Sequence, residues 1–234
     1  MQLIFASPTY GPIEPKALIS QRVAIMHAGN NGNEWLGDAS PNREGWETAR
    51  NKVVDSVVNS EHPDDAMLFW CDSDVVLPGN AITRLCETAK GVNGEPRDFV
   101  TGIYFQRHPP HRPLISTFNG DSFNWVMKWP DNAIAPIDGC GFGCVLTSLG
   151  MLRKMEKDWF KYQKFSEDFD FCLKAKNLGF QLWVDTAVYC EHLMDPKGAG
   201  FEDFKREHPQ FYAVNESEIG VNNGTECVGN QRNG

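Results

Sequence analysis

Residues Met67–Pro78 read MLFWCDSDVVLP, an apolar run that leads directly into two acidic residues. The five residues from Met67 to Cys71 predict a strand that is buried on both faces. Asp72 and Asp74 follow at its carboxyl end, and side chains at positions i and i+2 of an extended chain point the same way. We therefore expect both carboxylates to reach a common centre, where a cation would relieve their mutual repulsion.

The position of this acidic pair in the fold suggests a ligand site. Pro78 and Gly79 end the extended run, and Asn80 can cap a helix that continues to about Lys90. In open α/β sheets, ligands bind beyond the carboxyl ends of the strands. The alternative is an acidic turn, in which Asp74 caps a helix or forms an Asx turn.

Strands and helices alternate along the chain, so the predicted fold class is α/β. Predicted strands cover about residues 3–6, 67–71, 98–105, 114–118, 123–129, 144–146, 180–184 and 188–192. Predicted helices cover about residues 13–27, 43–59, 80–90, 150–157, 166–178 and 201–212. Residues 28–42 are polar and rich in Asn and Gly, which predicts a long loop.

The length of 234 residues suits one large α/β domain or two small ones. We expect one domain over residues 1–213 and a polar, mobile tail over residues 214–234, which has little apolar surface to bury. No apolar run approaches the roughly 18–20 residues that cross a bilayer. The first residues, MQLIFA, lack the basic start of a signal peptide, so a cytoplasmic location is expected.

Charge and cysteine content narrow the class of protein further. A formal net charge of −9 and a pI near 5.1 argue against broad binding to phosphate backbones. Against this acidic background, Arg107–Pro113 is a rigid, basic segment that either contacts an anionic ligand or forms a surface turn. Seven cysteines are an odd number, and none has Cys-x-x-Cys spacing, so we expect reduced thiols in the core.

Glycines mark a second segment of interest. Gly139, Gly141 and Gly143 occupy alternate positions just before an apolar strand. This spacing indicates a backbone that passes close to another group, and the plainer interpretation is a bulge or a tight strand crossing.

Acidic residues at the start of a helix form the third segment. Ser166 is a suitable N-cap and Gly179 a suitable residue just past the helix end. Glu167 and Asp168 fall in the first turn, where the helix dipole alone would favour acids by under about 1 kcal/mol each. Being adjacent, they point about 100° apart, so we expect them to have different roles. His192, at a strand end, is either a structural histidine or a metal ligand.

The order of these segments resembles the GT-A class of nucleotide-sugar glycosyltransferases, specifically its family 2-like group. The matching segments are Pro-Thr-Tyr (8–10), Ala-Arg-Asn (49–51), Asp-Ser-Asp (72–74), the glycine-rich segment, Glu-Asp-Phe-Asp-Phe (167–171) and Glu-His (191–192). The resemblance covers roughly residues 1–195, and the compact size is similar to small members from bacteria and viruses. It implies a single GT-A (Rossmann-like) domain with a central, mostly parallel sheet flanked by helices.

The resemblance also implies a role for each matching residue. Asp72, Asp74 and His192 would bind Mn²⁺ or Mg²⁺, and the imidazole would shift the preference toward Mn²⁺. Asp168 would act as general base, with Glu167 beside it. The residues that would contact the donor are Pro8, Thr9, Tyr10, Arg50, Asp72 and Ser73. Two departures concern the donor pocket: residues 28–42 form an unusually long insertion, and no second Asp precedes Asp72.

The implied activity is transfer of a sugar from a nucleotide-diphosphate donor, with a UDP-sugar favoured, to an acceptor hydroxyl with inversion. The acceptor could be a glycan, a lipid-linked glycan, a protein or a modified DNA base. A nucleotidyltransferase would use the same acids and metal, but it usually shows a glycine-rich basic loop after the first strand, where this chain reads SPTYG. A non-catalytic carbohydrate-binding relative would tolerate loss of the acids, and all of them are present.

Overall fold

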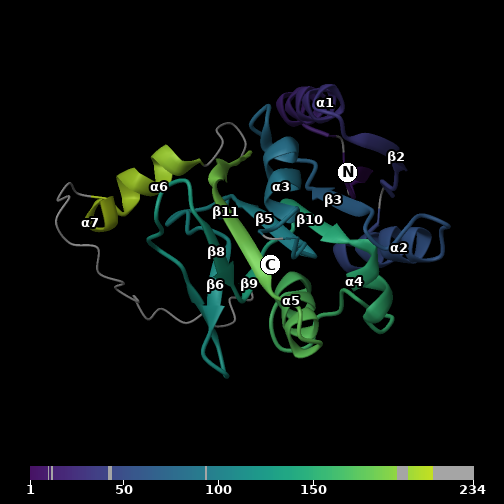
Figure 1. Ribbon diagram of the computed structural model, residues 1–234. Helices are drawn as coiled ribbons and strands as arrows, with labels where there is room; N and C mark the ends of the chain where they lie inside the picture. Colours follow the sequence, from purple (N-terminus) through teal and green to yellow (C-terminus); the bar gives the residue numbers. More distant parts are fainter. Residues whose placement is uncertain (10, 12, 42–43, 93, 194–199, 213–234) are drawn as a thin grey trace.

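A computed structural model describes residues 1–9, 11, 13–41, 44–92, 94–193 and 200–212. Its centre is a seven-stranded sheet in the order β2-β1-β3-β10-β5-β11-β8 (Figure 1). The strands are β1 (Gln2–Ala6), β2 (Glu34–Asp38), β3 (Met67–Cys71), β5 (Phe99–Ile103), β8 (Ile134–Ile137), β10 (Cys144–Ser148) and β11 (Leu182–Tyr189). Among these described strands, β10 and β8 run opposite to the other five, so the sheet is mostly parallel in direction, as predicted.

Strand β3 lies in the interior of the sheet, and all five of its residues are buried. Successive side chains of a strand point to opposite faces. Leu68 and Trp70 accordingly join one hydrophobic core, while Met67, Phe69 and Cys71 join another. This confirms the prediction of a strand buried on both faces.

Helices cover both faces of the sheet (Figure 1). The core around Met67 and Phe69 is closed by α1 (Pro15–Asn30) and α3 (Ala81–Ala89). The core around Leu68 and Trp70 is closed by α2 (Trp46–Val58), α4 (Leu149–Lys154) and α5 (Glu167–Asn177). Each helix therefore buries its apolar side against one face, as in a doubly wound α/β domain.

Two small sheets lie beside the central one. The first contains β7 (Phe123–Trp125), β6 (Ile115–Phe118) and β9 (Gly139–Cys140), so strands are present in both predicted segments, 114–118 and 123–129. The second pairs β4 (Val75–Val76) with β12 (Glu191–His192). In that pair His192 lies opposite Val75, which brings the late histidine next to the end of β3.

The prediction of a loop over residues 28–42 is wrong. Helix α1 continues to Asn30, and Glu34–Asp38 forms β2, parallel to β1 at the sheet edge. An edge strand is half exposed, so its residues EWLGD show no apolar alternation that would mark it in the sequence. Strand β8 was missed for a similar reason, since it contains Pro136, a residue confined to edge strands or bulges.

Two other boundaries differ from the prediction. Strand β11 is one continuous strand, whereas the sequence predicted two. The apolar pattern is interrupted at Asp185 and Thr186, which are polar but fully buried. Asp185 is paired there with Arg84 at 2.9 Å and with Thr88 at 2.6 Å. The predicted helix 201–212 is divided into α6 (Phe201–Glu207) and α7 (Pro209–Tyr212). Proline has no amide hydrogen to continue a helix, which accounts for the division at Pro209.

Helix α6 packs on the domain through aromatic side chains, since Phe204 stacks on Phe105 and Trp129 at centroid distances of 5.4 and 5.6 Å. The predicted tail, residues 214–234, lies outside the described residues. In the described part of the chain, the six cysteines are buried and form no disulfide bond. None of the helices described there is both long enough and apolar enough to cross a membrane.

Candidate active site

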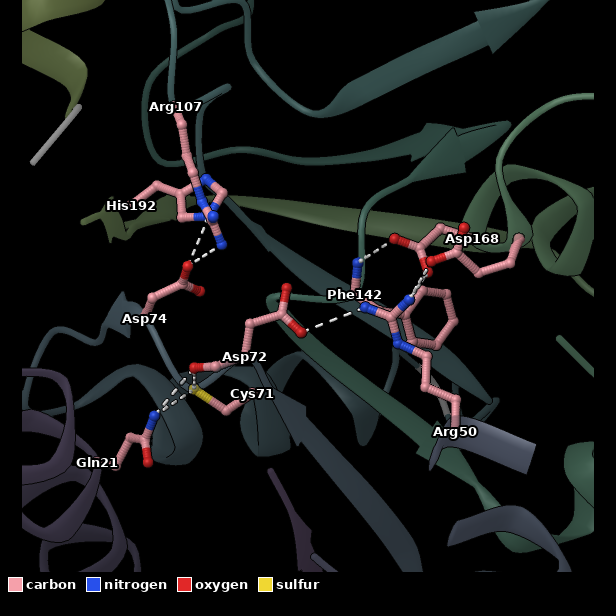
Figure 2. A network of polar contacts seen from close by, with 10 residues as sticks. Gln21, Arg50, Cys71, Asp72, Asp74, Arg107, Phe142, Asp168 and His192 are labelled. Atoms are coloured by element: carbon pink, nitrogen blue, oxygen red, sulfur yellow. Dashed lines mark hydrogen bonds and ion pairs between the residues drawn. The ribbon is translucent and has the colours of Figure 1, made fainter. Parts of the chain in front are cut away.

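The chain turns sharply where β3 ends. The amide of Val75 donates to the carbonyl of Asp72 at 3.2 Å, which makes residues 72–75 a hydrogen-bonded turn. Gln21 on α1 holds this turn, because its Nε2 donates to the same carbonyl at 3.1 Å. The extended geometry expected between positions i and i+2 is therefore absent, and the carboxylates of Asp72 and Asp74 have different partners (Figure 2).

Asp74 faces His192 and Arg107 (Figure 2). Its Oδ2 lies 3.5 Å from Nε2 of His192 and accepts a hydrogen bond from Nη2 of Arg107. Its Oδ1 is buried and has no hydrogen-bond partner. Burial acts to raise the pKa of Asp74, but the pKa lies below its ordinary value, and the positive charge of Arg107 contributes to that lowering. Asp74 is thus an ionised carboxylate with one acceptor atom unsatisfied.

The hydrogen bonds of His192 define its tautomer. Nε of Arg107 lies 2.9 Å from Nε2 of His192, and a guanidinium can only donate. Nε2 must therefore accept, so Nδ1 carries the proton and donates to the carbonyl of Phe105 at 2.8 Å. It follows that Nε2 does not also donate to Asp74, and that Arg107 carries the permanent charge next to this carboxylate.

The pair of Asp74 and His192 suits a divalent cation. A metal about 2.1 Å from each of two ligand atoms allows them to lie up to about 4.2 Å apart. The separation of 3.5 Å between Oδ2 and Nε2 satisfies this limit, and the tautomer leaves Nε2 without a proton, as a metal ligand requires. An Nδ1 proton donated to a backbone carbonyl is the usual support of a metal-ligating histidine.

The predicted trio of Asp72, Asp74 and His192 does not come together as a set. Within the described residues, no three side chains of His, Cys, Asp or Glu are grouped so that they could hold a metal ion. Asp72 turns away toward Arg50, with Oδ1 3.2 Å from Nη2. Two protein ligands are nevertheless enough for the kind of site in which substrate phosphates and water complete the coordination.

Arg50, on α2, is the centre of a second cluster. Its Nη1 donates to Oε1 of Glu167 at 2.8 Å and to Oδ1 of Asp168 at 2.5 Å, while Nη2 reaches Asp72. The residue is only 3% exposed, and its guanidinium lies 5.7 and 5.6 Å from the ring centroids of Phe142 and Phe160. The ion pairs of Arg50 are therefore contacts of a buried arginine and not surface ion pairs.

Asp168 is the carboxylate most affected by this environment. Burial raises its pKa to about 8, and the negative charges of Glu167 and Asp72 act in the same direction against the opposing charge of Arg50. Three carboxylates share one guanidinium here, so full ionisation would leave two negative charges without a counter-ion. The second oxygen, Oδ2, accepts from the amide of Phe142 at 3.3 Å. Asp168, whose side chain is 14% exposed, is consequently an acid that takes up a proton as the pH falls through about 8.

The acids of helix α5 differ in what they contact. Ser166 is at the N-cap position, although its side chain makes no capping hydrogen bond, and Gly179 adopts a positive φ of 90° just past the helix end, as predicted. Asp170 accepts from the amides of Gln163, Lys164 and Phe165 at 2.7–3.1 Å, which fixes the preceding loop. Glu167 and Asp168 do not diverge as predicted, because the long Arg50 side chain bridges them through one nitrogen.

The three glycines before β10 make room for aromatic rings. A Cβ atom on Gly141 would lie 2.1 Å from the hydroxyl of Tyr104, and one on Gly143 would lie 2.7 Å from the Tyr104 ring. A Cβ atom on Gly139 would lie 2.6 Å from the ring of Phe123. The expected close approach is thus confirmed. Tyr104 is buried between the two clusters, with its ring 5.3 Å from that of His192.

The residues predicted to hold the nucleotide are only partly grouped. Pro8 and Thr9 are buried at the end of β1, where the amide of Thr9 donates to the carbonyl of Pro41 at 3.1 Å. Tyr10 lies outside the described residues. Ser73 is half-buried in the turn between the two acids. Arg50, which was predicted to contact the donor, forms ion pairs with the three acids. Its contact with the donor remains a prediction.

Sequence reasoning missed Arg107 and Tyr104 as members of the site. Arg107 opens the basic segment 107–113, which stood out in an acidic chain, but nothing in the sequence connected it with Asp74. Tyr104 could have been found from the alternate glycines, since they indicated an unnamed close neighbour. A cavity of about 560 Å³ at the opposite edge of the sheet, lined by Met1, Asp65, Lys90 and Arg97 among others, is separate from these clusters.

No protein-family model matches this sequence, and no curated protein matches it significantly. Among solved structures, A197 from STIV aligns over 83% of this chain and 87% of its own, at 18% identity and a TM-score of 0.57. A UDP-glucose pyrophosphorylase in its apo form aligns over 91% of this chain and 98% of its own, at 8% identity and a TM-score of 0.50. These likenesses confirm the predicted fold class, a Rossmann-like α/β domain.

Proposed function

We propose that this protein is a divalent-metal-dependent transferase that moves a sugar from a nucleotide-diphosphate donor to an acceptor hydroxyl. The observation that carries the proposal is that side chains suited to bind a cation and a side chain suited to accept a proton lie at the same edge of the sheet. Asp74 and His192 form a pair suited to a cation, and Asp168, linked to Asp72 through Arg50, is a half-buried carboxylate with a raised pKa. A leaving diphosphate needs a cation to neutralise its charge, and an attacking hydroxyl needs a base to accept its proton.

Asp74 and His192 would hold the cation, Mn²⁺ being favoured over Mg²⁺ because one ligand is an imidazole. When bound, the metal supplies positive charge for the diphosphate as the bond to the sugar breaks. Asp72 lies in the same turn and keeps Arg50 in place, so its proposed contribution is to position the acid cluster next to the donor.

Asp168 would accept the proton of the acceptor hydroxyl. The hydroxyl oxygen forms a bond to the anomeric carbon, the bond from that carbon to the diphosphate oxygen breaks, and the nucleoside diphosphate leaves with the electron pair. A base whose pKa is about 8 matches proton transfer near neutral pH better than an ordinary carboxylate does. Arg50 and the amide of Phe142 fix its orientation, and a single displacement of this kind inverts the anomeric centre.

Nucleotidyl transfer is the second candidate, because the fold is also similar to that of a UDP-glucose pyrophosphorylase at a TM-score of 0.50. That reaction would join a sugar 1-phosphate to a nucleoside triphosphate and release pyrophosphate. The fold likeness supports a nucleotide-sugar ligand for either candidate. The general base at Asp168 favours sugar transfer, since pyrophosphate release needs no deprotonated hydroxyl.

Product analysis distinguishes these reactions without knowledge of the acceptor. The protein is incubated with Mn²⁺ and UDP-glucose, UDP-N-acetylgalactosamine or GDP-mannose, and nucleotides are separated by chromatography. Slow transfer to water, releasing free sugar and UDP (or GDP from GDP-mannose), is the expected result, and Asp168→Asn should suppress it. Formation of UTP (or GTP) and sugar 1-phosphate only when pyrophosphate is added would support nucleotidyl transfer, and no turnover with or without pyrophosphate would contradict both candidates.

A further inference from the structure

Arg107 occupies the position between the two ligand atoms of the candidate metal pair. Its Nη2 donates to Oδ2 of Asp74, and its Nε donates to Nε2 of His192 at 2.9 Å (Figure 2). These two acceptor atoms are the same ones that would bind a cation. One guanidinium therefore satisfies both of them with charge-assisted hydrogen bonds.

The three side chains differ in their freedom to move. Asp74 and His192 have side chains that are 16% and 10% exposed, and His192 is fixed by its bond to Phe105 and by the pairing of β12 with β4. Arg107 is 43% exposed and lies in the segment between β5 and β6. The side chain of Arg107 is thus the one that can leave the pair while the ligand atoms stay in place.

The backbone around Arg107 is held independently of this contact. The amide of Gln106 donates to the carbonyl of Arg112 at 2.9 Å, closing the basic segment on itself. Nε2 of His208, just after α6, lies 2.6 Å from the carbonyl of Pro110. Departure of the guanidinium consequently requires rotation of one side chain and no rearrangement of the loop.

A divalent cation and a guanidinium cannot share this position. Both need Oδ2 of Asp74 and Nε2 of His192, and two positive groups a few ångströms apart repel each other. We infer that Arg107 is an internal counter-cation that competes with the divalent metal for Asp74 and His192 and leaves them when the metal binds. This inference rests on the proposed function, because it assumes the metal pair described above.

The consequence is that Arg107 lowers the affinity for metal. In the metal-free protein the guanidinium keeps the carboxylate compensated, and the incoming cation must displace it. Removing Arg107 should therefore strengthen Mn²⁺ binding, which is the opposite of what loss of a ligand or of a structural residue would cause. A lysine at this position retains the competing charge and should bind metal about as the native protein does.

The test is Mn²⁺ affinity of the full chain, measured by electron paramagnetic resonance of the free ion in the absence of nucleotide. Arg107→Met should tighten binding about tenfold or more, since it removes two charge-assisted hydrogen bonds that compete with the metal. Arg107→Lys should stay within about threefold of the native affinity. The matched control is Lys16→Met, which removes a positive charge next to Glu191, the neighbour of His192, without touching either ligand. Its Mn²⁺ affinity should be unchanged.

Two further variants separate this inference from the proposed function. Asp74→Asn and His192→Gln should each lose Mn²⁺ binding. If they do, and Arg107→Met binds Mn²⁺ no more tightly than the native protein, Arg107 does not compete and the inference is overturned while the metal pair stands. If the native protein and all variants fail to bind Mn²⁺, the metal pair and the inference are both overturned. Thermal melting of each variant confirms that the comparison is made on folded protein.

Discussion

Nη1 of Arg50 lies 2.5 Å from Oδ1 of Asp168, and this buried ion pair joins helix α2 to the first turn of helix α5. The guanidinium also contacts Glu167 and Asp72, so a single side chain holds three carboxylates from two distant parts of the sequence, the end of β3 and the start of α5. Several properties of the protein follow from this arrangement and from the neighbouring pair of Asp74 and His192.

The first prediction concerns stability. Arg50→Met should lower the free energy of unfolding by about 2–4 kcal/mol, because it leaves three half-buried carboxylates without their counter-charge. Lys52→Met is the matched control on the same helix, since the exposed pair of Lys52 with Glu44 contributes at most about 1 kcal/mol. Urea denaturation measures both. Equal stability of the two variants would mean that Arg50 does not hold the acid cluster together.

The second prediction concerns the proposed base. Asp168→Asn keeps the shape of the side chain and removes its basicity, so the rate of sugar transfer should fall by about 10²- to 10⁴-fold. Binding of the nucleotide donor should change little. Glu167→Gln is the comparison, because Glu167 contacts the same nitrogen of Arg50. Normal transfer by Asp168→Asn together with loss of transfer in Glu167→Gln would reverse the two roles, and activity in both would remove them from the reaction.

The third prediction is a dependence of stability on pH. Because burial raises the pKa of Asp168 from 3.8 to about 8, the folded protein holds a proton there between these values and the unfolded chain does not. The stabilisation due to this group is therefore complete below about pH 4 and is lost as the pH rises toward 8. Asp168→Asn should remove that part of the slope when the free energy of unfolding is measured between about pH 5 and pH 8.5. An unchanged slope would refute the assignment.

The fourth prediction concerns the glycine segment. Gly141→Ala should cost about 1–3 kcal/mol of stability, because its Cβ would lie 2.1 Å from the hydroxyl oxygen of Tyr104. Removing that oxygen in the double variant Tyr104→Phe/Gly141→Ala should recover part of the loss, leaving a nearest contact of 2.9 Å. Gly37→Ala, where nothing lies within 4 Å of the added carbon, is the control. If Gly141→Ala and Gly37→Ala have the same melting temperature, the segment accommodates a Cβ atom at Gly141 and this prediction is wrong.

Local patterns in the sequence were sufficient for the main elements of the fold. Strand β3 is continuously apolar and helix α3 carries apolar residues at helical spacing, so both are marked by their own residues. Strand β2 is marked by nothing of this kind, because it is exposed and its pairing with β1 comes from the fold as a whole. Asp185 interrupts the apolar pattern of β11, and its burial is explained only by its ion pair with Arg84, 101 residues away in the sequence.

The sequence named several of the side chains in the two clusters, but not how they are arranged. Asp72, Asp74, Asp168 and His192 all lie in the two clusters, as the order of motifs suggested. The turn at residues 72–75 separates the two aspartates, and the sequence offered a turn here only as the alternative to an extended acidic pair. Arg50 meets Asp168 across 118 residues and Arg107 meets His192 across 85, so neither contact could be read from spacing.

The central claim is that Asp74 and His192 hold a divalent cation that the nucleotide donor requires. Isothermal titration of UDP into the protein tests this most directly, with Mn²⁺ or with EDTA, for the native chain and for Asp74→Ala. The native protein should bind UDP in Mn²⁺ at least about tenfold more tightly than in EDTA, and Asp74→Ala should lose this difference while keeping its fold by circular dichroism. Equal UDP affinity in Mn²⁺ and EDTA, or full Mn²⁺-dependent binding by Asp74→Ala, would contradict the claim.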